Sequence, residues 1–271
     1  MSYEKMAVCY DTQSCIKCFA CVISCSTENR MRLQRDYNYT VEKSMVEEQA
    51  HLNYLTVECS EKGKFPNVLQ IAAFRHCQHC DNPKCMEICP ALAISKKDTG
   101  AVVINQERCV GCQACKDVCP YDVPRYSKDT GKTYKCTMCH DRLTSGMPTA
   151  CAAACPSVAI FSGKQEEVIA EARKRAEHYS KVFNKEYFVY GADKVNDTVG
   201  TLSYMTIAPL ENRDDYLLPA DPTSGVAGGR EITKVIGTAA IIGTAAAVAG
   251  HAVYSAVKLS GKDEHKENEN E

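Results

Sequence analysis

Residues 109–120 read Cys-Val-Gly-Cys-Gln-Ala-Cys-Lys-Asp-Val-Cys-Pro and decide the fold of this chain. They place four cysteines at the spacing C-x2-C-x2-C-x3-C, directly before a proline. Three other blocks share the pattern, with a gap of four residues inside the second block and of eleven inside the fourth. The blocks hold sixteen of the eighteen cysteines, namely Cys15, Cys18, Cys21 and Cys25; Cys77, Cys80, Cys85 and Cys89; Cys109, Cys112, Cys115 and Cys119; and Cys136, Cys139, Cys151 and Cys155.

This spacing is typical of ferredoxin loops that hold [4Fe–4S] clusters. Three closely spaced cysteines direct their sulfurs to one cluster, whereas the fourth lies too far along the chain to close it. In two-cluster ferredoxins the fourth cysteine ligates the other cluster, and a proline then turns the chain away. The sequence therefore predicts blocks that work in pairs, four [4Fe–4S] clusters, and a chain that carries single electrons.

Two other uses of cysteine fit the spacing less well. Disulfide scaffolds are usually shorter than about 100 residues, and C-x2-C neighbours pair poorly with each other. Structural zinc takes two ligands from one short knuckle and two from a distant one, so the four cysteines of residues 15–25 would crowd a single ion. Cys9 and Cys59 lie outside the blocks and are expected to be ordinary buried or surface thiols.

The composition favours a small core that metal stabilises. The 271 residues include no tryptophan and only six phenylalanines, so the clusters are expected to supply part of the folding free energy. A net charge of −2 gives no indication of nucleic-acid binding. The N-terminus has neither an apolar signal segment nor a twin arginine before the first block, so no export signal is expected there.

The predicted fold class is α+β, a duplicated bacterial-ferredoxin-like fold of two modules, each for two [4Fe–4S] clusters, plus one C-terminal transmembrane helix. The four-cluster domain covers residues 1–163 and contains an insertion at 26–76. Within the insertion, residues 54–59 and 68–72 are predicted to form a β-hairpin around a turn at 61–64.

An internal repeat supports the duplication. Lys-Asp-Thr-Gly occurs at residues 97–100 and again at 128–131, each time before a short strand-like segment. The predicted elements of residues 164–208, which should pack on the cluster domain, are an amphipathic helix at 164–183 and strands at 186–190 and 201–207.

The C-terminal part contains a predicted membrane span. An extended linker rich in proline and glycine covers residues 209–234, and residues 235–257 then contain no Lys, Arg, Asp or Glu. As a helix they would be about 34 Å long, enough for a hydrocarbon core of about 30 Å, whereas a buried alanine-rich helix is the soluble alternative. A charged tail follows at 258–271, and its lysines slightly favour a cytoplasmic C-terminus.

The four blocks, the proline-rich linker and the single terminal helix resemble the iron–sulfur (β) subunits of the complex iron–sulfur molybdoenzyme, or dimethyl sulfoxide reductase, family. The resemblance is greatest to the subunits of the respiratory formate dehydrogenase-N type and of membrane-bound [NiFe] hydrogenases. In this family the first block pairs with the fourth, and the second with the third. The ligand sets that the resemblance implies are Cys15, Cys18, Cys21 and Cys155 for cluster 1; Cys136, Cys139, Cys151 and Cys25 for cluster 2; Cys77, Cys80, Cys85 and Cys119 for cluster 3; and Cys109, Cys112, Cys115 and Cys89 for cluster 4.

Two details refine this comparison. Some relatives replace one third-block cysteine with tryptophan and hold a [3Fe–4S] centre, whereas Cys112 keeps this block all-cysteine. Ser26, rather than proline, follows Cys25, which affects a turn and not a ligand. The resemblance thus implies four [4Fe–4S] clusters.

The resemblance also implies a function. It describes a non-catalytic subunit that passes electrons between a catalytic subunit and an integral membrane subunit, a cytochrome b or a quinone-binding protein. The first expectation for the catalytic partner is a formate dehydrogenase-type molybdopterin subunit. A [NiFe] hydrogenase and a polysulfide or thiosulfate reductase complex are the alternatives within this class, and a freely diffusing ferredoxin-like carrier is the alternative from another class.

The resemblance bears on location as well. In the family, the folded iron–sulfur subunit is exported together with a partner that carries the twin-arginine signal. The expected location is therefore the prokaryotic inner membrane, with a single span, a periplasmic cluster domain and a cytoplasmic C-terminus.

The predicted span makes one substitution informative. Ala239, Gly243 and Ala247 form a stripe of small residues that would let a second membrane helix approach closely. We expect Gly243→Leu to reduce recovery of the membrane partner in mild detergent while the iron content stays unchanged. Normal recovery of the membrane partner would mean that the helix is only an anchor, and loss of iron would mean that the span and the cluster domain are coupled.

Overall fold

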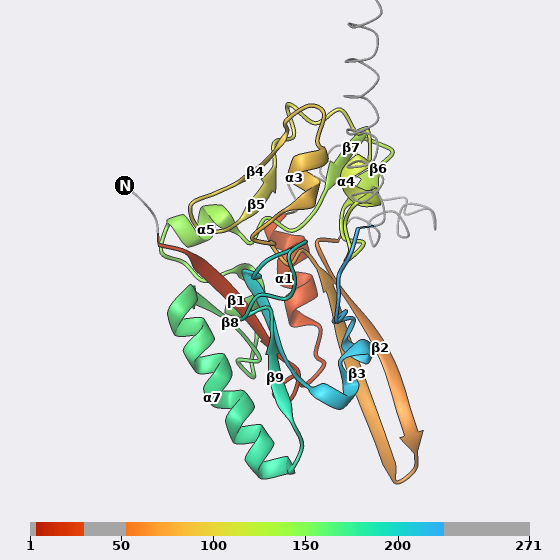
Figure 1. Ribbon diagram of the computed structural model, residues 1–271, viewed down its shortest axis with the longest axis vertical. Coiled ribbons are helices and arrows are strands. Elements are labelled where there is room, and N and C mark those ends of the chain that lie inside the picture. The colour runs from red at the N-terminus through yellow and green to blue at the C-terminus, as the bar shows by residue number, and fades with distance from the viewer. Residues whose placement is uncertain (1–3, 30–52, 225–271) are drawn as a thin grey trace, which may run out of the picture. The chain divides into compact units, whose positions relative to one another are not determined.

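The largest sheet joins the beginning of the chain to its later part. The computed structural model describes residues 4–29 and 53–224, and in them this sheet has the strand order β8-β1-β10-β9 (Figure 1). Its members are β8 (Ile160–Lys164), β1 (Met6–Asp11), β10 (Tyr204–Pro209) and β9 (Tyr187–Tyr190). β1 pairs parallel with β10 and antiparallel with β8, and β10 pairs antiparallel with β9.

The two faces of this sheet bury different partners, because successive residues of a strand point to opposite sides. Ala7 and Cys9 of β1 pack against helix α7 (Gln165–Phe183), which covers one face. Val8 and Tyr10 point the other way, into a core that contains cysteines of the first and fourth blocks. Cys9 is therefore a buried core thiol, as predicted, and the sheet separates α7 from the cysteine-bearing half.

Short helices and two small hairpins make up that half. The helices are α1 (Ala20–Glu28), α3 (Lys84–Ile88), α4 (Ala114–Asp117), α5 (His140–Thr144) and α6 (Ala150–Ala153), and the hairpins are β4 (Ile94–Lys96) with β5 (Val102–Ile104) and β6 (Arg125–Ser127) with β7 (Lys132–Tyr134). Each Lys-Asp-Thr-Gly phrase lies between the two strands of one of these hairpins. The internal repeat predicted from the sequence is therefore a repeat of structure.

A longer hairpin lies within the insertion. β2 (Leu55–Lys64) pairs antiparallel with β3 (Asn67–His76) along ten residue pairs, so the predicted hairpin is confirmed. The predicted turn at 61–64 is wrong, because those residues continue β2 and the chain turns at Phe65-Pro66. Proline has no N–H to give to the ladder, so Pro66 is where strand pairing has to stop. Cys59 lies exposed on β2, as expected for a surface thiol.

The helix and strands predicted over residues 164–208 are present as α7, β9 and β10. The boundary expected after residue 163 falls inside β8, because the later strands share one sheet with β1. The cluster-bearing half and residues 164–208 therefore fold together.

The extended linker predicted at 209–234 is wrong over its described part. Residues 210–212 and 214–216 form 3-10 helices, and Tyr216 and Leu218 are buried in a core shared with Tyr190. The Tyr190 hydroxyl also donates a hydrogen bond to the carbonyl of Pro219 at 2.9 Å. Burial of these apolar side chains outweighs the freedom that the prolines and glycines suggested.

Several predicted segments lie outside the described residues: the rest of that linker, the membrane span at 235–257, the tail at 258–271 and residues 30–52 of the insertion. Among the helices that the structure describes, none combines the length and apolar character that crossing a bilayer requires.

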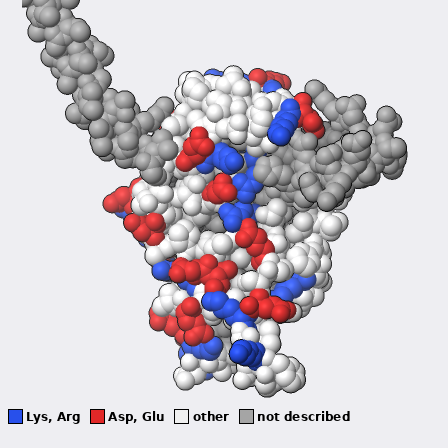
Figure 2. All heavy atoms as spheres, turned by 90° about the vertical axis from the view of Figure 1, so that its right-hand side faces the viewer, with Lys and Arg blue, Asp and Glu red and all other residues white. Residues whose placement is uncertain are grey.

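Acidic and basic side chains are interspersed on the face shown in Figure 2 and do not separate into patches of one sign. Among the described residues, charged side chains form cross-strand and long-range pairs, such as Arg75 with Glu58 at 2.6 Å and Lys62 with Asp215 at 2.6 Å. This mixture agrees with the near-neutral charge of the chain, and the described residues on this face form no basic track for nucleic acid.

A buried carboxylate fastens α7 to the end of β1. Asp11 is fully buried and accepts hydrogen bonds from the Tyr179 hydroxyl at 2.7 Å and from Nη1 of Arg175 at 3.3 Å, both on α7. Ser14, which opens the loop toward the first block, donates to the same carboxylate at 2.9 Å. The network therefore connects the helix, the sheet and the first cysteine loop.

We expect Asp11→Ala to lower the free energy of unfolding by about 3 kcal/mol, because it leaves Arg175 and Tyr179 without their buried acceptor. For a protein of this size the apparent Tm should fall by about 6–12 °C in anaerobic thermal denaturation. Asp193→Ala is the matched control, since its pair with Arg173 is exposed and should contribute less than about 1 kcal/mol. Equal shifts in the two variants would contradict a special role for Asp11.

Candidate metal centres

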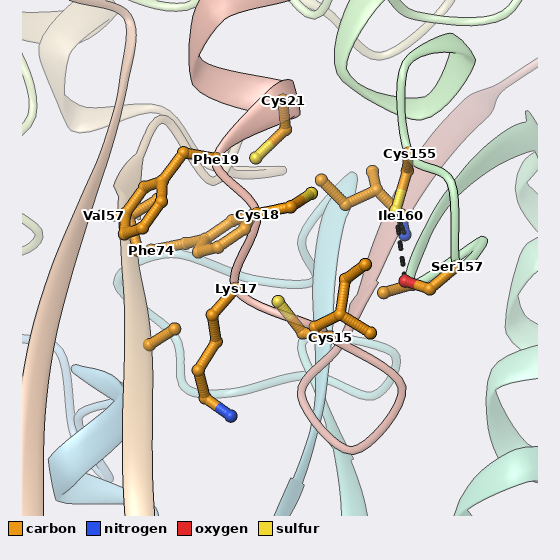
Figure 3. Close-up of a pocket in the computed structure, with 13 residues that line it drawn as sticks. Cys15, Lys17, Cys18, Phe19, Cys21, Val57, Phe74, Cys155, Ser157 and Ile160 are labelled. Atoms are coloured by element: carbon orange, nitrogen blue, oxygen red, sulfur yellow. Dashed lines mark hydrogen bonds between the residues drawn. The ribbon is translucent and has the colours of Figure 1, made fainter.

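The structure gathers the sixteen block cysteines into four groups, each drawn from two blocks. Site 1 contains Cys15, Cys18 and Cys21 of the first block and Cys155 of the fourth, which line one cavity. Figure 3 shows these four side chains around a common space, with Phe19 and Phe74 beside it. Residues far apart in the sequence thus meet because β8, which follows Cys155, pairs with β1, which precedes Cys15.

Site 2 combines the same two blocks in the opposite proportion, with one cysteine of the first block and three of the fourth. Cys25 of the first block lines one cavity together with Cys136, Cys139 and Cys151 of the fourth. Cys25 reaches this site because α1 carries it one helical turn beyond Cys21, and α1 packs against α6, which contains Cys151.

Sites 3 and 4 are built in the same way from the second and third blocks, each of which contributes three cysteines to one site and its last cysteine to the other. At site 4, Cys89 lines one cavity with Cys109, Cys112 and Cys115. Site 3 consists of Cys77, Cys80, Cys85 and Cys119. The pKa of Cys80 is raised by burial and, after it, by the nearby thiolates of Cys77, Cys119 and Cys85. These three thiols therefore lie close to Cys80 and form site 3 with it.

The backbone turns in the same way at the start of every block. The residue two positions after the first cysteine has a positive φ in all four, at Lys17 (59°), His79 (48°), Gly111 (67°) and Met138 (57°). This region favours glycine, so the three other residues adopt it at a cost. The turn directs the N–H groups of His79 and Met138 at the first Sγ of their blocks, at 3.4 and 3.3 Å.

A second repeated turn follows the Cys-Pro pairs. Leu92, Asp122 and Val158, each three residues after a fourth cysteine, all have a positive φ, and their N–H groups donate to the carbonyl of that cysteine at 3.1–3.2 Å. Cys25 differs, because it lies inside α1 and the chain continues through Ser26 as helix. The missing proline therefore changes the local backbone, as predicted, while Cys25 still reaches site 2.

The four sites follow one another in the order 1, 2, 3, 4. Sites 1 and 2 are adjacent because Cys21 and Cys25 lie on the same helix. Sites 3 and 4 are adjacent because Cys85 lies in α3 and Cys89 directly follows it. Between the pairs, Cys136 of site 2 lies close to Cys77 of site 3, whose thiolate contributes, after burial and Cys25, to raising its pKa.

The ends of this series are the parts nearest to solvent. Of the sixteen block cysteines, the exposed ones are Cys18 of site 1 and Cys112 of site 4. Large apolar side chains that line the cavities are exposed beside each, namely Ile16 (62% exposed) and Phe19 (44%) at site 1 and Val110 (68%) at site 4. Sites 2 and 3 lie between them.

Many of the block cysteines are buried or half-buried close to one another, so their thiolate forms are unfavourable unless a cation lies beside them. Burial, and then the neighbouring thiolates of Cys151 and Cys15, raises the pKa of Cys21 to about 12. Burial likewise raises the pKa of Cys115 to about 11, with Cys109 and Cys112 adding to the effect. Four crowded thiolates at one site therefore need a positively charged group among them.

A [4Fe–4S] cluster fits these cavities. Within residues 4–29 and 53–224, no three His, Cys, Asp or Glu side chains converge as ligands of a single ion do. At sites 1, 2 and 4 the four thiols instead line one common cavity, as ligands of a multi-iron cluster do. At site 2, Tyr204 and His76 also line the cavity, and in the described structure the buried Tyr204 Oη has no other acceptor than the sulfur atoms there.

Neither Tyr204 nor His76 was predicted from the sequence. Both lie far from the fourth block along the chain, on β10 and β3, and neither belongs to a motif. Only the pairing of those strands with their neighbours brings them to site 2.

The geometry of site 2 leads to a prediction about crossed ligation. We expect Cys25→Ser to alter the same electron paramagnetic resonance signal as Cys139→Ser, although Cys25 is closer in sequence to the cysteines of site 1. Cys59→Ser, on the exposed strand β2, is the control and should leave every signal unchanged. A Cys25→Ser spectrum that matches Cys18→Ser would contradict the assignment.

Comparison with known proteins gives a consistent picture. Residues 70–165 match the model of a "4Fe-4S dicluster domain". The sequence is 30% identical over 184 residues to the nitrate-inducible formate dehydrogenase iron-sulfur subunit of Escherichia coli, covering 65% of this chain and 62% of that subunit. It is 33% identical to a tetrathionate reductase subunit of Salmonella typhimurium, covering 59% and 58% of the two proteins. It is 30% identical to an anaerobic dimethyl sulfoxide reductase chain of Haemophilus influenzae, covering 58% of this protein and 73% of that one.

Proposed function

This protein belongs to the family of iron–sulfur subunits that includes the anaerobic dimethyl sulfoxide reductase chain of Haemophilus influenzae, and we propose that it carries single electrons through four [4Fe–4S] clusters. The family predicted from the sequence is thereby confirmed. The observation that carries the proposal is the composition of sites 1 to 4: each site combines three cysteines of one block with one cysteine of the partner block.

The proposed cluster ligands are the four cysteine side chains of each of the sites 1 to 4. Bound clusters would supply reversible one-electron chemistry, and their potentials depend on hydrogen bonds to sulfur, charge and solvent exposure. The protein controls these factors through the N–H groups that point at Sγ atoms, such as those of Ala93 toward Cys89 at 3.3 Å and Ile160 toward Cys155 at 3.4 Å. The Tyr204 hydroxyl would donate a hydrogen bond to sulfur at site 2.

The linear order of the sites supports a path with two ends. Electrons would enter at one of the solvent-near sites, 1 or 4, and leave at the other, while the two inner sites relay them. Exposed apolar residues at both ends, including Leu92 (69% exposed) and Val110 (68%) around site 4, would be covered by partner subunits. A free carrier needs only one such contact area, so two favour a subunit held between two partners.

We propose a formate dehydrogenase-type molybdopterin subunit as the catalytic partner and a cytochrome b or quinone-binding protein as the membrane partner. The similarity to the formate dehydrogenase subunit and the predicted terminal span support this choice. A reductase of oxidised sulfur compounds is the second candidate, because the similarity to the tetrathionate reductase subunit is of the same degree. This chain itself would perform no bond chemistry on the substrate.

The proposed location follows from the predicted span at residues 235–257. The chain would cross the prokaryotic inner membrane once, with the cluster domain in the periplasm and the C-terminus in the cytoplasm. The lysines that follow the span support this orientation.

Metal analysis tests the central claim. Anaerobically purified complex should contain about sixteen iron atoms and about sixteen acid-labile sulfides for each copy of this chain, after subtraction of the partners' own iron. A value near eight would remove two of the four clusters, and stoichiometric zinc would replace the proposed chemistry. Co-purified pterin would support the molybdopterin partner, whereas a cluster-loaded chain that purifies alone would favour the free carrier.

A further inference from the structure

A buried lysine lies at the junction between sites 2 and 3. Lys135 follows β7 and directly precedes Cys136, a site 2 cysteine, and only 4% of its surface is exposed. Lysines are almost never buried to this degree without a partner, because an ammonium group taken out of water loses a large hydration free energy. The groups around its amine therefore indicate what it does.

Carboxylates do not compensate this charge. Across the part of the chain that the structure describes, Lys135 forms no ion pair with Asp or Glu, and its Nζ donates hydrogen bonds to two backbone carbonyls. One belongs to Val102 on β5, and the other, at 3.1 Å, to Cys136. The carbonyls fix the position of the amine but carry no net negative charge.

Thiolates of two sites supply the negative charge instead. Val102, whose carbonyl accepts from Nζ, donates its own N–H to Nδ1 of His79 at 2.9 Å, inside the loop from Cys77 to Cys80, so the amine lies beside site 3 as well as beside Cys136. The thiols that act on the amine are accordingly those of Cys77, Cys85 and Cys136. Cys77 and Cys85 belong to site 3, whereas Cys136 belongs to site 2. The amine thus faces both inner sites at once, from a position that the two carbonyls hold.

We propose that Lys135 is a built-in cation of the electron path, which raises the reduction potentials of the clusters at sites 2 and 3 together. The proposal rests on the proposed function, since it requires clusters at those two sites. An electron added to either cluster increases the negative charge close to the ammonium group, which stabilises the reduced form. Because the group is buried, salt screens this effect much less than it screens a surface pair.

The position between the sites gives the charge a second consequence. A cation that faces both clusters shifts both potentials in the same direction, so it lowers the energy of an electron on the inner half of the path without opposing transfer between sites 2 and 3. Sites 1 and 4 lie beyond the inner sites and should be affected much less. Lys135 would therefore set the inner pair apart from the outer pair.

Substitutions that separate charge from packing test this role. Lys135→Met removes the charge at similar volume, Lys135→Arg retains it, and Lys132→Met removes a lysine that also donates to a carbonyl, that of Gln106. Each variant of the full chain, in its complex, is analysed first for iron content and then by redox titration followed by electron paramagnetic resonance. Signals of sites 2 and 3 are assigned with Cys139→Ser and Cys80→Ser.

We expect the Lys135→Met variant to retain about sixteen iron atoms. The reduction potentials of the clusters at sites 2 and 3 should each fall by at least about 59 mV, which is a tenfold change in the equilibrium constant of a one-electron reduction. The outer potentials should shift by less than half of this. Lys135→Arg should keep all four potentials close to those of the unmodified protein, and Lys132→Met should leave the inner two unchanged.

The outcomes separate the two proposals. Unmodified protein with far fewer than about sixteen iron atoms would contradict the proposed function, whatever Lys135 does. With iron at the expected level, unchanged inner potentials in Lys135→Met, or equal shifts at all four sites, would overturn the inference. If Lys135→Met loses iron, Lys135→Arg decides: retained iron with unchanged potentials supports the charge, and iron loss in both variants shows that the residue only fills space.

Discussion

The attraction between buried thiolates and a metal cluster is the interaction on which the rest of this structure depends. Sixteen cysteines are gathered into four groups, and burial raises the pKa of those thiols for which a shift is evident, such as Cys139 to about 11. A protein interior does not tolerate such groups of negative charge without positive charge among them. Short helices of four or five residues and three-residue strands, which would not be stable by themselves, surround these groups. Cluster binding and folding are therefore one process in this half of the chain.

The sheet allows that half to be rigid although its own core is thin. β1 buries Ala7 and Cys9 against α7 and presents Val8 and Tyr10 to the cysteine-bearing side. A conventional apolar layer thus supports one face while the metal-binding layer uses the other. The Tyr10 ring stacks on Phe74 of β3 at a centroid distance of 3.7 Å, which ties the long hairpin to the same strand.

Sequence reasoning succeeded where a residue type has a single strong use, and it failed where packing chooses among conformations. The period of α7 and the cysteine spacing are of the first kind, because apolar burial and thiolate ligation each leave a regular pattern. The positive φ values of Lys17 and Met138 are of the second kind, since neither residue type favours that region. Tyr216 and Leu218 were hidden among prolines, and Lys135 looked like any surface lysine until the strands brought three thiolates around it.

Crossed ligation also determines how electrons can move between neighbouring sites. Cys21 and Cys25 lie at the two ends of one helical turn of α1, about 6 Å of rise, so a single rigid element sets the separation of sites 1 and 2. α3 does the same for sites 3 and 4 through Cys85 and Cys89. No described helix carries cysteines of both site 2 and site 3, where the two modules meet through Cys136 and Cys77. The middle transfer step is thus the one that helix geometry does not fix, and beside it lies a buried ammonium group held by β5 and the carbonyl of Cys136. In a duplicated fold, a buried charge such as that of Lys135 is needed only at the junction between the modules, because within each module a helix already sets the separation of the two sites.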